Sequence, residues 1–308
     1  MSQPPFRIGI PEFLMSEFRA FYTSHDGQYF AGCTDEGLIR VWNAADLSLV
    51  ATLYNSFEDC SLRMAIDPGN HLLFSGAWDE GLSCHDYMTG AHLWHRDELP
   101  GIQKVDYACG FPSSIHVAAE VPGTEPDETT ALEGVIELDS RTGKIIWQDK
   151  EVSSMFLHPS DALVVIENRR DRQMSILDGS KKICGSLGMA HFTIMDVAFN
   201  GDLIAVAEGT HGLRIIDRQG KVLVRHIPTD RECHFIRVRF DHSSGNWSFV
   251  DQHDEAILVT LDGKSGRLLN ECRSNSWGSP IGDGSRYVDY EGQVCRLGDG
   301  EVLARLAM

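Results

Sequence analysis

The amino-acid sequence predicts an all-β fold, a seven-bladed β-propeller with four antiparallel strands in each blade. First, a unit of apolar strand, polar corner and second apolar strand occurs seven times, with corners at 43–46, 86–90, 139–143, 178–180, 217–220, 262–266 and 298–300. Second, these corners lie on average about 42 residues apart, the spacing of four-stranded propeller blades. Third, an apolar content of 42% is enough for a continuous core between blades, and helical periodicity is absent outside residues 11–17.

The blades follow one another along a single domain that covers residues 1–308. In the first blade, short β-rich runs are separated by turns that contain Gly and Asp, which are strand and turn signals. The same order of four runs indicates the second, fifth and sixth blades, whereas the fourth is more polar and the seventh is the weakest. The predicted blades are 12–54, 58–97, 102–150, 152–188, 191–227, 233–272 and 277–307.

Two segments depart from the repeat. Residues 120–133 lengthen the third blade and contain two prolines and several acidic side chains without an apolar period, which predicts a loop that projects from the blade. Residues 6–10 (FRIGI) precede the first blade and have the composition of a spare strand. We expect that strand to pair with the last blade and close the ring, because closure removes an exposed sheet edge.

Charge and composition restrict the class of partner and the compartment. The 45 acidic residues outnumber the 27 basic ones, which gives a net charge of -18. Nucleic acid is therefore not an expected ligand, and an acidic surface favours a basic protein as partner. The alternative is that the charge serves solubility alone. No apolar stretch is long enough to span a membrane, and the N-terminus lacks the pattern of a signal peptide. The eight scattered cysteines form no C-x-x-C pair, which suits a reducing cytoplasm.

Motifs for catalysis or metal binding are not found, so the sequence assigns no catalytic residue, no metal ligand and no cofactor. Residues 263–265 (GKS) resemble the end of a phosphate loop, but Leu258 stands where that motif needs glycine, and the segment is predicted to be a hairpin corner. His92 and His95 are three apart in one strand and are expected on opposite faces. His85 and His95 are expected to meet across a hairpin, as a structural pair rather than a metal site.

Residues 25–53 resemble a WD-repeat blade. Residues 25–27 (HDG) stand at the first turn of that family's repeat, Asp35 at its structural aspartate, and residues 42–43 (WN) at its Trp-Asp dipeptide. Asp79 in the second blade matches Asp35. The resemblance implies a propeller fold and a role in binding other proteins.

Residues 86–94 and 139–147 instead resemble the repeats of quinoproteins, in which Asp and Thr-Gly precede a strand that ends in Trp. Both families are propellers, so both resemblances imply the same architecture. The alcohol-oxidising quinoproteins carry a disulfide between adjacent cysteines. This chain has no Cys-Cys pair, so their activity is not expected here.

Alignment of the innermost strands by their apolar core residues predicts a ring of polar residues. The position just before the core residue is Arg63, Asp106, Ser154, Asp196, Arg237 and Trp277 in the second to seventh blades, and Arg19 or Ala20 in the first. We expect this position near the mouth of the central channel. Arg and Trp are common hot-spot residues, so Arg63, Asp106, Asp196, Arg237 and Trp277 are predicted to anchor a partner. The alternative is that the two Arg and two Asp neutralise one another across the channel.

The acidic loop of the third blade is expected to overhang the same face. Its predicted contact residues are Glu120, Glu125, Asp127 and Glu128. Acidic side chains beside a mixed-charge channel mouth are suited to a basic protein. The alternative is an ordinary solvated loop.

Three functions remain open from the sequence. The first is a non-catalytic scaffold or adaptor that binds a macromolecular, basic partner through one face. The second is an inhibitor, such as an immunity protein, that masks a basic toxin or enzyme. The third is a small propeller hydrolase or lyase with a channel site, for which Asp106, Asp196, His116 and Glu120 are the first candidates.

Overall fold

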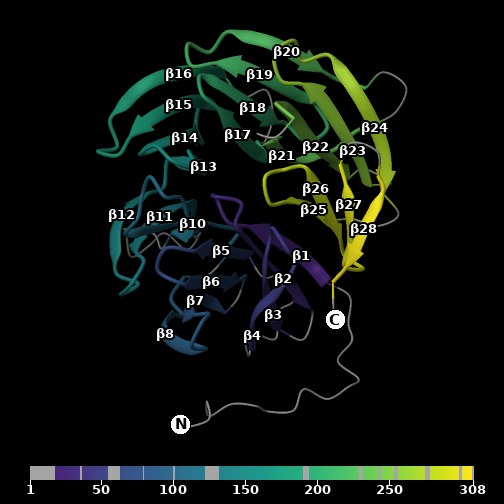
Figure 1. Ribbon diagram of the computed structural model, residues 1–308. Helices are drawn as coiled ribbons and strands as arrows, with labels where there is room; N and C mark the ends of the chain where they lie inside the picture. Colours follow the sequence, from purple (N-terminus) through teal and green to yellow (C-terminus); the bar gives the residue numbers. More distant parts are fainter. Residues whose placement is uncertain are drawn as a thin grey trace.

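The chain folds into seven four-stranded antiparallel sheets arranged around a central axis, which confirms the predicted fold class (Figure 1). The computed structural model describes residues 18–34, 37–54, 63–78, 80–99, 101–121, 132–189, 194–228, 232–241, 244–252, 256–274, 278–297 and 300–306. Every sheet consists of four strands that are consecutive in the sequence. The strands of each described blade are therefore built from one continuous segment.

The strands are numbered in chain order. Blades 1 and 2 contain β1 (Phe18–Thr23), β2 (Tyr29–Thr34), β3 (Leu38–Asn43), β4 (Leu49–Tyr54), β5 (Arg63–Asp67), β6 (Leu72–Ala77), β7 (Gly81–Asp86) and β8 (Ala91–Arg96). Blades 3 and 4 contain β9 (Lys104–Asp106), β10 (Ser114–Val121), β11 (Leu132–Asp139), β12 (Ile145–Asp149), β13 (Val152–Leu157), β14 (Leu163–Asn168), β15 (Gln173–Asp178) and β16 (Ile183–Met189). Blades 5 and 6 contain β17 (Asp196–Asn200), β18 (Leu203–Ala207), β19 (Leu213–Asp217), β20 (Val222–His226), β21 (Phe235–Asp241), β22 (Asn246–Gln252), β23 (Ala256–Asp262) and β24 (Leu268–Ser274). Blade 7 contains β25 (Gly278–Ile281), β26 (Arg286–Asp289), β27 (Gln293–Arg296) and β28 (Val302–Arg305).

The corners are turns between the third and fourth strands, and in blades 1 to 6 the side chain of the first corner residue holds the turn. In blade 2, Oδ1 of Asp86 accepts hydrogen bonds from the backbone N–H groups of Met88 (2.9 Å) and Thr89 (3.0 Å). Gly90 closes this corner with a φ of 74°, which a residue without a Cβ adopts at little cost. These bonds join residues two to three apart, so the sequence alone was sufficient to locate the corners.

A β-bulge follows the corner in every blade, because the register between the third and fourth strands shifts in all seven sheets. In blade 2 the bulge leaves Leu93 unpaired, so that His85 lies opposite His92 while Ser83 lies opposite His95. The prediction that His92 and His95 point to opposite faces is therefore wrong, because the extra residue shifts the alternation of side chains. His85 meets His92, with ring centroids 5.0 Å apart, rather than His95.

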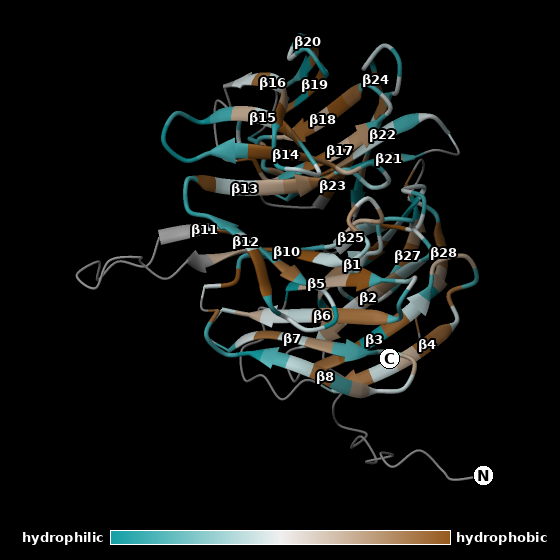
Figure 2. Cartoon of the chain, turned by 90° about the vertical axis from the view of Figure 1, so that its left-hand side faces the viewer, coloured by the Kyte–Doolittle hydropathy of each residue, from teal (hydrophilic) through white to brown (hydrophobic). Residues whose placement is uncertain are grey.

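The core lies between the blades, and each hydrophobic cluster draws mainly on two neighbours. The cluster between blades 1 and 2, for example, joins Ile39 and Val41 to Met64 and Ile66. In Figure 2 the apolar colour concentrates along the strands, whereas many of the turns are hydrophilic. A blade can bury its two faces only against its neighbours, so the ring has to close.

Closure occurs between blade 7 and blade 1. Phe18 and Trp42 of blade 1 belong to the same buried cluster as Ile281 and Val288 of blade 7. The backbone N–H of Phe18 also donates a 3.0 Å hydrogen bond to the carbonyl oxygen of Tyr290. The predicted closing strand at residues 6–10 lies outside the described residues and stays a prediction.

The two ends of the ring differ in the loops that they carry. We call the end that bears the second-to-third-strand turns and the links between blades the connection face. The opposite end, with the first-to-second-strand turns and the corners, is the corner face. The first strands lie around the middle of the ring and the fourth strands at its rim (Figure 1). Among the described residues there is no helix of the length and apolar character needed to cross a membrane.

Candidate functional site: the central channel

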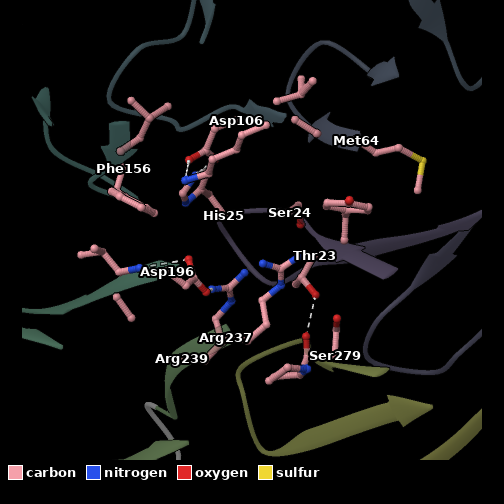
Figure 3. Close-up of a pocket in the computed structure, with 18 of the residues that line it drawn as sticks. Thr23, Ser24, His25, Met64, Asp106, Phe156, Asp196, Arg237, Arg239 and Ser279 are labelled. Carbon is pink, nitrogen blue, oxygen red and sulfur yellow. Dashed lines mark hydrogen bonds and ion pairs between the residues drawn. The ribbon is translucent and has the colours of Figure 1, made fainter. Parts of the chain in front are cut away.

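The first strands of all seven blades enclose a central channel of about 630 Å³. Its lining includes four of the predicted site residues, namely Arg63, Asp106, Asp196 and Arg237. Figure 3 shows Asp106, Asp196 and Arg237 around this space, together with His25 and Arg239, which the sequence did not predict as site residues. The structure thus brings together most of the predicted ring.

One member of the predicted ring lies in a different layer. To compare blades, we number the residues of each second strand from the one that pairs with the first residue of the corner in the same blade. Arg63, Asp196 and Arg237 all pair at the position four residues further along, with Gly76, Ala207 and Val250. In blade 3 this position is Ala118, whose partner is Lys104.

Asp106 pairs instead with His116, so it lies one layer nearer the corner face. The sequence alignment placed Tyr107 at the core position of this strand. The residue equivalent to the core position of the other blades is Val105, two residues earlier. Both Val105 and Tyr107 are buried, so apolar character alone could not distinguish the two registers.

The carboxylate of Asp106 is held by a histidine and a lysine. Its Oδ1 lies 3.0 Å from Nε2 of His25, and its Oδ2 lies 3.3 Å from Nζ of Lys104. Burial alone would raise the pKa of the Asp106 carboxyl, but Lys104 and His25 outweigh burial and hold that pKa well below its usual range. Lys104 also donates to the carbonyl oxygen of Met155 (3.0 Å) and lies 3.7 Å from the ring centroid of Phe156. Asp106 is therefore an ionised, anchored group.

Asp196 is anchored in a similar way at the boundary of blades 5 and 6. Its Oδ2 accepts hydrogen bonds from Nη1 of Arg239 and from the backbone N–H of Val238, both at 3.0 Å. The cationic partner of Asp106 is thus Lys104, and that of Asp196 is Arg239. The alternative prediction, in which the two aspartates neutralise Arg63 and Arg237 across the channel, is wrong because their partners are Lys104 and Arg239 instead.

Arg63 and Arg237 lie at the connection end of the channel. Nε of Arg63 donates to the carbonyl oxygen of Gln103 (2.9 Å), and Nη1 of Arg237 donates to that of Ile236 (3.3 Å). Both lie near the phenol of Tyr22: burial raises the pKa of Tyr22, and the positive charges of Arg63 and Arg237 oppose part of that rise. This end of the channel is consequently basic.

The remaining predicted residues are placed differently. Glu120 lies in β10, opposite Glu133 in β11, so the two strands extend as a hairpin toward the insert. Glu125, Asp127, Glu128 and Trp277 lie outside the described residues. Nothing in the structure therefore tests the acidic loop.

His116, a candidate for the channel-enzyme function, is buried in a polar cluster between blades 3 and 4. Its Nε2 lies 3.6 Å from Oε1 of Glu137, and Nζ of Lys181 lies 2.8 Å from Oε2 of the same carboxylate. Burial lowers the pKa of His116 to about 4. The only signal for this cluster in the sequence was a His and a Glu inside apolar strands.

The described residues contain no group of three or more His, Cys, Asp or Glu side chains that could hold a metal ion. His85, His92 and His95 of blade 2 share one face, but the rings of His92 and His95 are 6.5 Å apart at their centroids, and Nδ1 of His95 contacts the hydroxyl of Ser83 (3.0 Å).

Exposed side chains on the connection face complete the site. Trp78, in the turn between β6 and β7, is 42% exposed, although an indole is costly to leave in water. Its carbonyl oxygen accepts a 2.7 Å hydrogen bond from the N–H of Gly101, which fixes the turn. The sequence analysis did not single out Trp78.

Comparisons with known proteins support the fold. The structure resembles the crystal structure of the β-propeller domain of Cps50 (Swd1) from Myceliophteria thermophila, with a TM-score of 0.69 at 10% sequence identity. The match covers 92% of this chain and 95% of that domain. No protein-family model matches the sequence. No curated protein matches it either.

Proposed function

We propose that this propeller is a non-catalytic interaction module that binds a protein partner through its connection face. The observation that carries the proposal is Trp78, a tryptophan that stands 42% exposed on a turn of that face. Tryptophan and arginine dominate the energetics of protein interfaces, and Arg63 and Arg237 line the channel at the same end. The likeness to another β-propeller domain over 92% of the chain is consistent with a rigid platform for such contacts.

The finer parts of this proposal rest on the sequence. The chain is a divergent WD-repeat protein with quinoprotein-like blades, and it acts in the cytoplasm. Its partner is basic, because a net charge of -18 favours association with positive surfaces and repels nucleic acid and acidic lipids. The acidic residues Glu125, Asp127 and Glu128 contribute to this selectivity.

The channel carboxylates argue against the hydrolase or lyase function. Lys104 and His25 hold the pKa of Asp106 well below its usual range, so this carboxyl is not poised to donate a proton near neutral pH, and the carboxylate of Asp196 is already engaged by Arg239. The inhibitor function differs from the adaptor function only in the nature of its basic partner.

The test is affinity capture from native lysate with the immobilised protein and two matched variants. Trp78→Ala alters the connection face. Met88→Ala alters the corner face of the same blade, where Met88 is 56% exposed. We expect a stoichiometric partner that is retained by Met88→Ala and lost with Trp78→Ala. A partner retained equally by both variants would move the interface elsewhere.

A second comparison tests the chemistry of the partner. Replacing Glu125, Asp127 and Glu128 with Ser should weaken capture, and the effect should shrink as ionic strength rises, because salt screens exposed charges. A single dominant basic enzyme or toxin, inactive when bound, would identify the inhibitor function. Capture that is insensitive to both salt and these substitutions would contradict a basic partner.

A further inference from the structure

The connection half of the channel carries a charge opposite to that of the whole protein. Within the described part of the chain, the first strands place five cationic side chains in the channel lining and two carboxylates. The cations are Arg19, Arg63, Lys104, Arg237 and Arg239, and the carboxylates are Asp106 and Asp196. In a chain with a net charge of -18, this local excess of positive charge is unexpected from composition alone.

The other carboxylates of the lining do not offset this excess. Asp26 and Asp283 belong to first-to-second-strand turns, and so lie toward the corner face. Oδ1 of Asp26 accepts from the hydroxyl of Ser24 (2.7 Å), and Oδ1 of Asp283 accepts from the N–H of Ser285 (3.0 Å). Both carboxylates are thus engaged within their own turns.

Arg237 shows the imbalance most clearly. Its hydrogen bond runs to the carbonyl oxygen of Ile236 at 3.3 Å, and no carboxylate of the described residues forms an ion pair with it. The neighbouring Arg239 already neutralises Asp196 (3.0 Å). Figure 3 shows Arg237 and Arg239 together between Asp196 and Thr23 in the open middle of the channel. A guanidinium carries five N–H donors, and the hydrogen bond to Ile236 engages only one of those of Arg237, which lines the channel.

We propose that the channel binds a small polyanion, a molecule with two or more carboxylate or phosphate groups, between Arg63, Arg237 and Arg239. The volume of about 630 Å³ falls within the range of small-molecule sites, roughly 300–1,000 Å³. Guanidinium groups bind the paired oxygens of carboxylate and phosphate through charge-assisted hydrogen bonds. Such a ligand also offsets the cost of holding several like charges in a partly desolvated space.

The measurement is isothermal titration calorimetry of the full chain with two probes, citrate and inorganic pyrophosphate. Binding of one molecule of either probe per chain is expected, and the tighter probe distinguishes a carboxylate ligand from a phosphate ligand. The variant Arg237→Gln should weaken binding by about tenfold or more, since a hydrogen bond to a charged group is lost. The control is Arg225→Gln, which removes the same charge from an exposed position in the rim strand β20.

A variant with the opposite expected effect guards against loss of folding. Asp196→Asn removes the carboxylate that neutralises Arg239 while keeping an oxygen acceptor for the N–H of Val238. Binding of the preferred probe should then tighten several-fold, a result that a misfolded variant cannot give. Absence of binding by both probes at millimolar concentration, or equal loss in Arg237→Gln and Arg225→Gln, would overturn the proposal.

This inference does not depend on the proposed partner. Trp78→Ala, which should abolish capture, is expected to leave the affinity for the probes unchanged because Trp78 does not line the channel. Probe binding without a protein partner would leave the channel site intact and remove the interaction function. Capture of a partner without binding of either probe would support the interaction function and remove the channel site.

Discussion

The ammonium Nζ of Lys181 in blade 4 lies 2.8 Å from Oε2 of Glu137 in blade 3. Lys181 occupies a corner at a φ of 64°, and its ammonium also faces the aromatic rings of Phe111 (4.9 Å) and Trp147 (5.4 Å). Burial would raise the pKa of Glu137, but the hydrogen bond and the positive charge of Lys181 outweigh burial and lower it overall. The pair therefore ties two blades together through a charged contact.

Lys181→Met is expected to destabilise the protein by about 3 kcal/mol, because it leaves the largely buried carboxylate of Glu137 without its cation. Urea unfolding at pH 7 measures this loss. Lys182→Met, at the adjacent exposed position, serves as the control and should change stability little. Equal effects of the two substitutions would show that the ion pair does not support the fold. The double variant Lys181→Met with Glu137→Leu should recover much of the loss, since no buried charge then remains unpaired.

Stability is expected to fall as the pH is lowered from 6.5 to 4. The pKa of His116 is lowered by burial to about 4, so the native imidazole stays neutral while the unfolded chain takes up a proton below about pH 6.5. The unfolded state then binds more protons, which costs up to about 3 kcal/mol of stability at pH 4 for this residue. Urea titrations at several pH values should give a shallower pH dependence for His116→Gln than for the wild type. Identical slopes would contradict the prediction.

Gly27→Ala is expected to weaken ring closure by about 1–3 kcal/mol. Gly27 has a φ of 69°, and an added Cβ would lie 2.5 Å from the carbonyl oxygen of Gly282 in blade 7. Gly90→Ala is the matched control, because Gly90 has a φ of 74° but nothing within 4 Å of the added atom. Thermal unfolding of the two variants separates the cost of the backbone conformation from the cost of the contact with Gly282. A similar loss in both variants would mean that backbone conformation alone, and not the contact between blades, sets the cost.

Trp94→Phe is expected to cost about 1 kcal/mol, because the indole Nε1 of Trp94 in blade 2 donates to the carbonyl oxygen of Ser140 in blade 3 (3.1 Å). Phenylalanine keeps most of the packing but has no donor. Trp78→Phe, at an exposed position, should leave the unfolding midpoint unchanged. If the two substitutions were indistinguishable, this link between blades would be of no energetic consequence.

The architecture could be predicted because its signals are local. A corner such as that of blade 2 depends on residues only a few positions apart, as Asp86 and Gly90 show, and seven corners at a regular spacing specify seven blades. The position of Arg63, Asp196 and Arg237 around the channel follows from the same repeat.

The details of the site depend on features that a linear pattern does not carry. The sequence placed Asp106 one layer too far from the corner face, because Val105 and Tyr107 are both apolar and both buried. The prediction of the strand face on which His95 lies was wrong, because the alternation of residue types in the sequence does not reveal a bulge. The contacts of Lys181 with Glu137 and of Arg239 with Asp196 join residues more than 40 positions apart, in different blades.

The bulge beside each corner affects how readily the protein aggregates at high concentration. The fourth strand of every blade is an outermost strand, and several of these strands expose apolar pairs, such as Ile145 and Ile146 in β12 or Leu268 and Leu269 in β24. Such a strand would be a template for stacking one molecule on another. A bulge bends and twists the strand that carries it, so its free backbone groups no longer form a flat row that another chain could match. The same kind of bulge that obscured the register of blade 2 thus protects the outermost strand of each of the seven blades from pairing with another molecule.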